Sequence, residues 1–136
     1  MTARKKALVT GGGTGIGRSA VLALARAGFD VAITYASSAK AAQAVAEEAQ
    51  ALGAQTLLLQ CDVSDDAAVR LMLAKVGEAF GHLDTLINNA GTTATWKVKD
   101  LDSLDMGAWD RTFAVNVRGN FQVTRAAVEL LRKSKD

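Results

Sequence analysis

The 136-residue sequence contains no proline and a single cysteine, and aromatic residues make up only 5% of it. Because Cys61 has no second cysteine to pair with, an internal disulfide framework is excluded. No segment approaches the roughly 20 apolar residues that span a bilayer. The apolar run at residues 7–9 is also much shorter than the core of a signal peptide. We therefore expect a cytoplasmic protein without a membrane span.

Positive and negative charges are nearly balanced in the sequence. The sequence has 16 Lys and Arg residues against 14 Asp and Glu residues, which leaves a formal net charge of +2. With no long basic run, nucleic acid is not expected as a partner. Hydrophobic residues make up 49% and charged residues 22%, close to the average for soluble globular proteins. A disordered or collagen-like chain is excluded, and the length suits one domain with a sizeable core.

Short apolar runs alternate along the chain with longer segments of helical periodicity. The runs lie at residues 7–9, 31–33, 56–59 and 83–87, and the helical segments include 19–27 and 39–52. Apart from Thr56, Asp84 and Thr85, the runs are apolar at successive positions and not at every second one, which is typical of parallel strands buried on both faces. Right-handed crossovers then give an α/β fold with a doubly wound parallel sheet, whose ligand site lies beyond the carboxyl ends of its strands. Candidate functional residues therefore lie at 10–17, 34–40, 60–63 and 88–95.

Residues at the expected helix ends support these boundaries. Gly28 and Gly53 each follow a helical segment, where glycine commonly ends a helix. Ser64 is expected to cap a third helix, which has Asp65 and Asp66 in its first turn and stops at Gly81.

A long final helix is indicated by large apolar residues at every fourth position. We refer to Trp109, Phe113, Val117 and Phe121 as the stripe; Thr124, Val128 and Leu131 prolong it. We interpret the stripe as core or as a subunit contact rather than as a substrate pocket.

Glycines crowd the turn after the first strand, which reads Thr10-Gly11-Gly12-Gly13-Thr14-Gly15-Ile16-Gly17. Such a turn lets the backbone approach a pyrophosphate, and the helix that follows offers free N–H groups. An ordinary glycine-rich turn is the plain alternative. The fingerprint with glycines at i, i+2 and i+5 does not fit, because Ile and Arg occupy positions 16 and 18. A triphosphate-binding loop is closer, but Arg18 stands where that loop needs lysine.

Four stretches in register resemble the short-chain dehydrogenase/reductase family, with the general character of its 3-oxoacyl-(acyl-carrier-protein) reductases. They are Thr-Gly-x-x-x-Gly-Ile-Gly at 10–17, Cys-Asp-Val at 61–63, Asn-Asn-Ala-Gly at 88–91 and Phe-Ala-Val-Asn-Val-Arg-Gly at 113–119. The resemblance covers essentially the whole chain. It implies a Rossmann-type sheet of four strands in the order 3-2-1-4, truncated before a fifth strand.

The resemblance also implies a role for each matching residue. The cofactor pyrophosphate would be held by Gly11, Gly13, Thr14, Gly15, Ile16 and Gly17. The adenine would be held by Asp62 and Val63, and the ribose and nicotinamide side would be lined by Asn89, Ala90 and Gly91. A turn or helix-capping role is the alternative for Asp62.

Three further residues receive supporting or catalytic roles. Thr10 is expected to tie the glycine loop to the Asn-Asn-Ala-Gly segment, and Asn88 is expected to be a structural hydrogen-bonder at a strand end. By resemblance Asn116 is a catalytic residue that distorts the final helix and holds a proton-relaying water. A solvent-facing helix asparagine is the alternative. No metal site is expected.

The end of the second strand favours NADP over NAD as cofactor. An acidic residue there would bond the ribose 2′-hydroxyl of NAD and repel a 2′-phosphate. The sequence from 34 to 40 has no acid, and its hydroxyl groups, with Ser37 as the candidate contact, and Lys40 suit a phosphate. Asp30 precedes the strand and is expected to point away.

The catalytic residues that the resemblance calls for are absent. The family uses a Tyr and a Lys four residues apart and a Ser on the preceding strand. The only tyrosine, Tyr35, lies five residues before Lys40, and we interpret it as a strand-end packing residue. We interpret His82 and Cys61 as structural. Residues 1–136 are therefore expected to form a single NAD(P)-binding domain that is incomplete at its C-terminal side.

Three functions remain open at this point. The first is an NADP-dependent oxidoreductase acting on a small carbonyl or alcohol substrate, of which this chain is the cofactor-binding half and inactive alone. The second is a non-catalytic nucleotide-binding or scaffold module, and the third is a nucleoside triphosphatase. We also expect a homo-oligomer formed through the exposed edge of the fourth strand or through the final helix.

Overall fold

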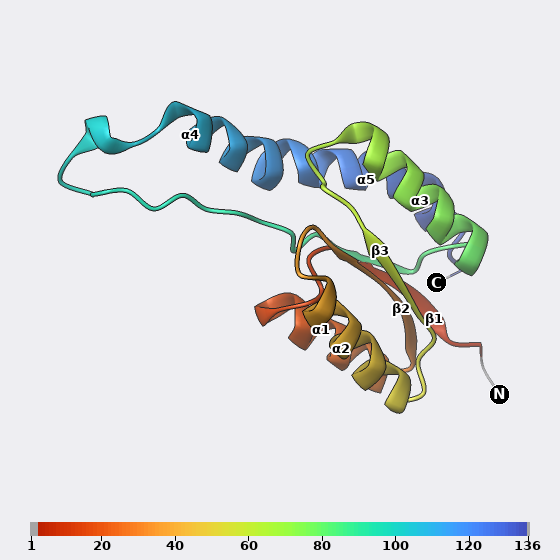
Figure 1. Ribbon diagram of the computed structural model, residues 1–136. Helices are drawn as coiled ribbons and strands as arrows, with labels where there is room; N and C mark the ends of the chain where they lie inside the picture. Colours follow the sequence, from red (N-terminus) through yellow and green to blue (C-terminus); the bar gives the residue numbers. More distant parts are fainter. Residues whose placement is uncertain (1–2, 136) are drawn as a thin grey trace.

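A computed structural model describes residues 3–135 and shows a parallel four-stranded sheet in the order β3-β2-β1-β4 (Figure 1). The strands are β1 (Lys5–Val9), β2 (Phe29–Tyr35), β3 (Thr56–Gln60) and β4 (Thr85–Ile87). All three strand pairs are parallel. The predicted fold class and strand order are thus confirmed.

Two layers of helices cover the sheet (Figure 1). On one face lie α1 (Gly15–Arg26) and α2 (Ala39–Ala51), and on the other lie α3 (Asp66–Phe80) and α5 (Asn120–Leu131). Leu8 belongs to the core cluster under α3 and α5, whereas its neighbour Val9 belongs to the cluster under α1 and α2. Because both faces are covered, the central strand is apolar at successive positions.

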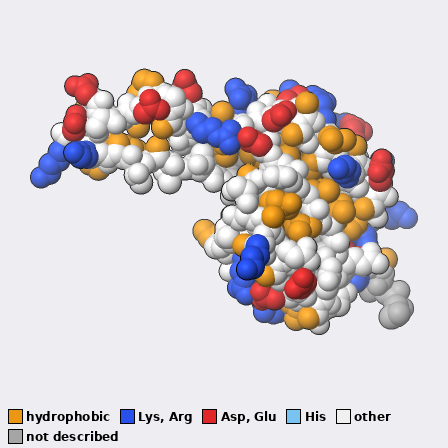
Figure 2. Space-filling view, viewed as in Figure 1, with side chains coloured by type: hydrophobic (Ala, Val, Ile, Leu, Met, Phe, Trp, Pro, Cys, Tyr) orange, Lys and Arg blue, Asp and Glu red, His pale blue; other side chains and the backbone are white. Residues whose placement is uncertain are grey.

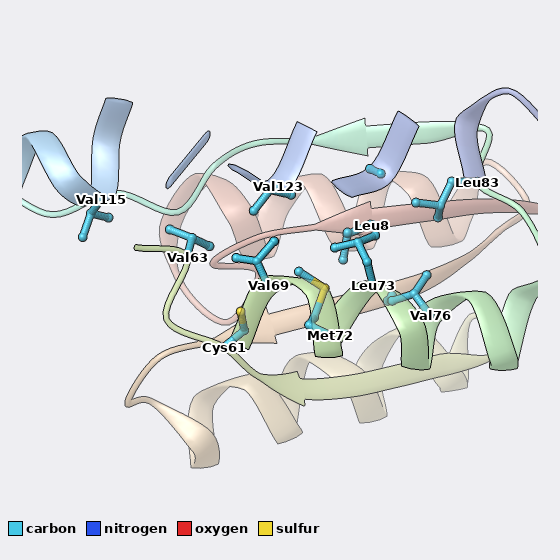
Figure 3. Close-up of a cluster of buried hydrophobic side chains, with 12 residues drawn as sticks. Leu8, Cys61, Val63, Val69, Met72, Leu73, Val76, Leu83, Val115 and Val123 are labelled. Atoms are coloured by element: carbon cyan, nitrogen blue, oxygen red, sulfur yellow. The ribbon is translucent and has the colours of Figure 1, made fainter. Parts of the chain in front are cut away.

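The larger of the two clusters lies under α3 and α5 (Figure 3). Val69, Leu73 and Val76 of α3 meet Val123 of α5 and Leu8 of β1 there. Such close packing fixes the carboxyl end of β3, from which the candidate site residues extend.

β4 is shorter than the apolar run at 83–87 predicts. Leu83 is fully buried, but its N–H donates to the carbonyl of Leu130 at 3.1 Å, outside the strand ladder. The strand pairs with β1 only from Thr85 to Ile87. Leu83 is apolar because it packs under α5, and not because it belongs to the strand.

The helix ends agree with the glycine signals and correct one capping prediction. Gly28 and Gly53 take φ values of +89° and +88° after α1 and α2, as predicted. Ser64 was expected to cap α3, and this is wrong. The N-cap is Asp65, whose carboxylate accepts from the Ala68 N–H at 3.1 Å. The Ser64 hydroxyl instead donates to Asp62 at 2.7 Å.

The predicted long final helix is divided into three parts. They are α4 (Met106–Phe113), a π-helical segment η2 (Ala114–Gly119) and α5, and they follow a short 3-10 turn η1 (Leu101–Ser103). The extended segment 92–100, η1 and α4 project from the sheet and its helices (Figure 1). Figure 2 shows charged side chains at the far end of this projection.

The stripe does not lie in the core. The exposed fractions of Trp109, Phe113, Val117 and Phe121 are 49%, 50%, 58% and 61%. The core interpretation of the stripe is therefore wrong for these four residues, and the subunit-contact interpretation stays a prediction. Between residues 3 and 135, the structure holds no helix long and apolar enough to cross a membrane.

Candidate functional site

A cavity of about 540 Å³ lies at the carboxyl ends of the strands. It is lined by Gly11, Gly13, Thr14, Gly15, Ile16, Thr34, Tyr35, Ala36, Ser37, Ser38, Cys61, Asp62, Val63, Asn89, Ala90, Gly91, Thr92, Arg111 and Val115. These residues come from the four regions that the sheet pattern singled out, together with η2 and α4. Every predicted cofactor-binding residue except Gly17 lines the cavity.

Gly17 supports the loop by close packing. A Cβ atom at this position would lie 2.1 Å from the carbonyl oxygen of Gly11, a distance that no real contact allows. Only glycine lets α1 begin this close to the loop. Gly11 itself has a φ of +63°, which favours glycine in the turn.

The loop is fastened to the fourth strand through Thr10. The Thr10 Oγ1 atom accepts from the N–H groups of Asn89 and Ala90, both at 3.0 Å. The Asn89 Nδ2 atom donates in return to the carbonyls of Thr10 and Gly11, at 3.1 Å and 2.9 Å. The predicted tie between the glycine loop and the Asn-Asn-Ala-Gly segment is confirmed.

The loop is fastened to the second strand through Thr34, a contact that the sequence analysis did not predict. The Gly12 N–H donates to the Thr34 carbonyl at 3.1 Å, and the Gly11 N–H donates to Thr34 Oγ1 at 3.3 Å. Thr34 is 1% exposed, so both bonds are shielded from water. With β2 on one side and β4 on the other, the loop is held from both neighbouring strands.

The N-terminus of α1 lines the cavity with Gly15 and Ile16. The N-cap Thr14 makes no side-chain capping bond, and the first turn has no acidic residue. The Arg18 N–H is the donor that reaches the Thr14 carbonyl, at 3.1 Å. The N–H groups of Gly15, Ile16 and Gly17 precede it and have no partner within the helix. Together with the helix dipole, they make this end of the cavity suited to an anion such as a diphosphate.

Asp62 lines the same cavity. Burial raises the pKa of its carboxyl group, but hydrogen bonds from Ser64 and Arg111 outweigh burial and lower the pKa below its usual value. The carboxylate accepts from the Ser64 N–H at 3.0 Å, so the turn role weighed for Asp62 is present as well. Arg111, which sequence reasoning missed, reaches the Asp62 carboxylate from α4 at 3.1 Å.

Asn116 lies in η2 behind the cavity wall. The Asn116 side chain forms hydrogen bonds with the backbone of Thr92. The backbone carbonyl of Asn116 accepts from Asn120 Nδ2 at 2.8 Å. The expected helix distortion at Asn116 is confirmed by the π-helical turn. A solvent-facing Asn116 is excluded by its bonds to Thr92. Its place in a proton relay stays a prediction. The Asn120 Oδ1 atom is buried without a partner among the described residues.

The structural interpretations of three further residues hold. Asn88 Nδ2 donates to Thr124 Oγ1 at 2.8 Å, which joins the end of β4 to α5. His82 Nε2 lies 3.1 Å from Asp84 Oδ2. Cys61 is packed in the core under α3, and burial together with Asp62 and Asp65 raises the pKa of its thiol to about 11. Within the described residues, no group of His, Cys, Asp and Glu could hold a metal ion.

Tyr35 is the last residue of β2 and also lines the cavity. The placement of Asp30 receives a correction. Asp30 lies inside β2 instead of before it, because the strand begins at Phe29. Its carboxylate is nonetheless at the opposite end from the cavity, as predicted, where it pairs with Arg4 at 2.9 Å and Lys6 at 2.5 Å.

Comparison with known protein families identifies the family of this chain. A family model described as short chain dehydrogenase matches residues 5–136. The chain belongs to the short-chain dehydrogenase family. Among curated proteins it is 39% identical over 134 residues to the 3-oxoacyl-(acyl-carrier-protein) reductase FabG of Staphylococcus aureus. It is 40% identical over 129 residues to versicolorin reductase stcU of Emericella nidulans.

Solved structures of short-chain dehydrogenases share the fold. One from Burkholderia xenovorans superposes with a TM-score of 0.94 at 36% identity, covering 100% of this chain and 56% of that one. Another, from Burkholderia cenocepacia in complex with NADP, has a TM-score of 0.86 at 46% identity, covering 93% and 51%. The chain spans about half the length of the curated relatives it matches, with 53% of the FabG protein and 48% of the versicolorin reductase covered.

Proposed function

We propose that residues 1–136 form an NADP-binding domain of an oxidoreductase that acts on a small carbonyl or alcohol substrate. The observation that carries the proposal is the cavity itself, which is lined by the uncapped N-terminus of α1, by Gly11 and Gly13 of the glycine loop, and by Asp62. A dinucleotide needs donors for its diphosphate and a polar contact for its adenine, and the cavity offers both. When bound, the nicotinamide ring would donate or accept a hydride.

Different residues of the cavity would contact different parts of such a cofactor. The N–H groups at the start of α1 would bind the diphosphate, and Asp62 with Val63 would hold the adenine. Asn89, Ala90 and Gly91 would line the ribose and nicotinamide side. Because Asn89 also fixes the carbonyls of Thr10 and Gly11, it would set the distance between the diphosphate and nicotinamide regions.

The choice of NADP rests on the start of α2. Ser37 and Ser38 line the cavity, and α2 begins there with no side-chain cap and no acidic residue in its first turn. Lys40 is the second residue of that helix. Helix dipole, hydroxyl groups and lysine all favour a 2′-phosphate. The relative from Burkholderia cenocepacia that was solved in complex with NADP supports the same choice.

We propose that the 136-residue chain is inactive alone. Its only tyrosine, Tyr35, lies in the same cavity wall as Ser37 and Ser38, on the adenosine side of the proposed cofactor. No Tyr-x-x-x-Lys pair occurs anywhere in the sequence, so the chain lacks the group that would give a proton to a carbonyl. A non-catalytic nucleotide-binding module is the alternative that shares this observation.

A triphosphatase is disfavoured by the position of Arg18. In a triphosphate-binding loop the residue at this position reaches the phosphates. Here the Arg18 guanidinium pairs with Glu48 of α2 at 2.6 Å and does not line the cavity.

A second copy of this chain is the proposed protein partner. The stripe leaves Trp109, Phe113, Val117 and Phe121 about half exposed or more along α4, η2 and α5. β4 pairs with β1 on one side, and no described strand pairs with its other side. An exposed apolar face and an open strand edge both favour association.

Titration of the chain with NADPH and with NADH tests the proposal, with carbonyl reduction assayed on the same sample. We expect tighter binding of NADPH and no turnover. Tighter binding of NADH would overturn the choice of NADP, and robust turnover would overturn the inactivity. A Ser37→Glu variant should lose NADPH affinity and keep NADH affinity. Ser103→Glu, which adds the same charge at an exposed position far from the cavity, is the matched control.

A further inference from the structure

The two carboxylate oxygens of Asp62 are used unequally. Oδ1 accepts from both the N–H and the hydroxyl of Ser64, at 3.0 Å and 2.7 Å. Oδ2 accepts from Arg111 Nη1 at 3.1 Å, which is its one partner among the described residues. Each carboxylate oxygen has two acceptor positions. Oδ1 is therefore saturated, and the remaining position for a ligand donor is on Oδ2, beside the Arg111 guanidinium.

Arg111, Asp62 and Ser64 are joined by a closed ring of hydrogen bonds. The Arg111 Nη1 atom donates to Asp62 Oδ2 and also to Ser64 Oγ, the latter at 2.7 Å. The Ser64 hydroxyl thus accepts from Arg111 and donates to Asp62 Oδ1. The ring uses both hydrogens of Nη1 and fixes the rotation of the carboxylate.

The ring contributes little to folding. The exposed fractions of the Arg111 and Asp62 side chains are 52% and 43%, and ion pairs this exposed add little to stability. Arg111 belongs to α4, which has no buried residue. Among the described residues that line the cavity, Asp62 and Arg111 are the only charged ones. An exposed pair that spans 49 residues of sequence and lies in a ligand cavity is better explained by what it presents to the ligand.

We infer that Arg111 is a positioning residue for the adenine base: it orients Asp62 Oδ2 to accept the exocyclic amine and so contributes to the preference for adenine. The inference rests on the proposed dinucleotide function and deepens it. Arg111 acts through Asp62, and the bond to the amine is made by the carboxylate.

The hypoxanthine analogue of NADPH, in which a carbonyl oxygen replaces the adenine amine, separates this role from others. The wild-type chain should bind NADPH more tightly than the analogue, because the carbonyl oxygen cannot donate to Asp62. Arg111→Ala should weaken NADPH binding about threefold to fivefold and leave the analogue unchanged, an effect of the size expected for an exposed charged pair. The ratio of the two dissociation constants is the readout, and a merely structural role would not change it.

Arg118→Ala is the matched control. The Arg118 Nη2 atom donates to the Ser64 carbonyl at 3.5 Å, but Arg118 does not line the cavity. This variant should keep the wild-type ratio. In an Asp62→Asn background, Arg111→Ala should change the ratio no further, because the two residues act on the same bond.

Three outcomes would overturn the inference. Equal weakening of NADPH and the analogue in Arg111→Ala would show that the guanidinium acts on a part common to both ligands. Unchanged binding of both ligands by Arg111→Ala would show that Asp62 needs no such positioning. A wild-type chain that binds neither dinucleotide would overturn the proposed function and this inference with it, so the wild-type titration distinguishes the two failures.

Discussion

Asn116 holds both backbone polar groups of Thr92. Its Oδ1 atom accepts from the Thr92 N–H, and its Nδ2 atom donates to the Thr92 carbonyl, each at 2.8 Å. One side chain thereby pairs a loop residue as a neighbouring strand would. Because Thr92 lines the cavity directly after Gly91, Asn116 fixes the wall where the nicotinamide side of the proposed cofactor would lie.

Replacement of Asn116 by alanine should therefore destabilise the chain. Two backbone groups of Thr92 lose their partners, which costs about 2 kcal/mol in the free energy of unfolding. Urea denaturation without cofactor measures this change. Asn88→Ala removes a single bond to Thr124, which is exposed to solvent, and should cost less than half as much. Equal costs for the two variants would contradict the role given to Asn116.

Two glycines of the loop should respond differently to alanine. A Cβ at position 17 would meet the Gly11 carbonyl, so Gly17→Ala should cost at least about 3 kcal/mol. At Gly15 a Cβ would meet nothing within 4 Å, and only the φ of +53° opposes alanine, at about 1 kcal/mol. Thermal unfolding of the two variants in the absence of ligand checks the order. A Gly17→Ala chain as stable as Gly15→Ala would contradict the packing described for α1.

Acid should weaken the fold through Asp30. Burial raises the pKa of this carboxyl group, but bonds from Lys6, Gln55 and Arg4 outweigh burial and lower it below 3.8. A carboxylate whose pKa is lowered in the folded state stabilises the fold above the unfolded value, and this contribution is lost as the pH falls through the folded pKa. The free energy of unfolding should thus decline from about pH 5 downwards.

Asp30→Asn isolates this contribution. At pH 7 it should cost about 2 kcal/mol, because the bonds from Lys6 and Arg4 lose their charged acceptor. Its stability should fall less steeply with acid than that of the wild type. Asp102→Asn, at an exposed position in η1, should follow the wild-type curve. Parallel acid profiles for Asp30→Asn and the wild type would refute the assignment.

Association through the stripe is tested by polar substitution. Sedimentation velocity at tens of micromolar should show the wild-type chain above monomer mass and Phe121→Ser shifted toward monomer. Leu71→Ser is the matched control, because Leu71 on α3 is as exposed as Phe121, at 61%. A monomeric wild type, or an equal shift in both variants, would rule the stripe out as the contact.

The sheet could be predicted from the sequence because its strands are buried on both faces. Leu8 and Val9 face opposite helix layers, so the strand signal is a plain apolar run that needs no tertiary information. The glycine loop and the Asn-Asn-Ala-Gly segment were found because each follows such a run. Leu83 was misassigned to a strand since burial under α5 produces the same apolar signal.

Other features depend on contacts that leave no local signal. Ser64 and Asp65 are both good N-caps, and the choice is decided by Asp62, which takes the Ser64 hydroxyl. The π-helical turn at Asn116 interrupts a stripe whose spacing looks continuous in sequence. Arg111 could not be found, because its partners lie 47 and 49 residues away.

The projecting segment, residues 92–113, lies outside the packed core of the domain. α4 contributes no buried side chain, so residues there are under almost no packing constraint from the core. The sheet, α1, α2, α3 and α5 supply the cohesion of the domain without it. Substitutions between Thr93 and Phe113 should therefore leave folding intact, and Arg111 is the residue through which this segment contacts the proposed cofactor site.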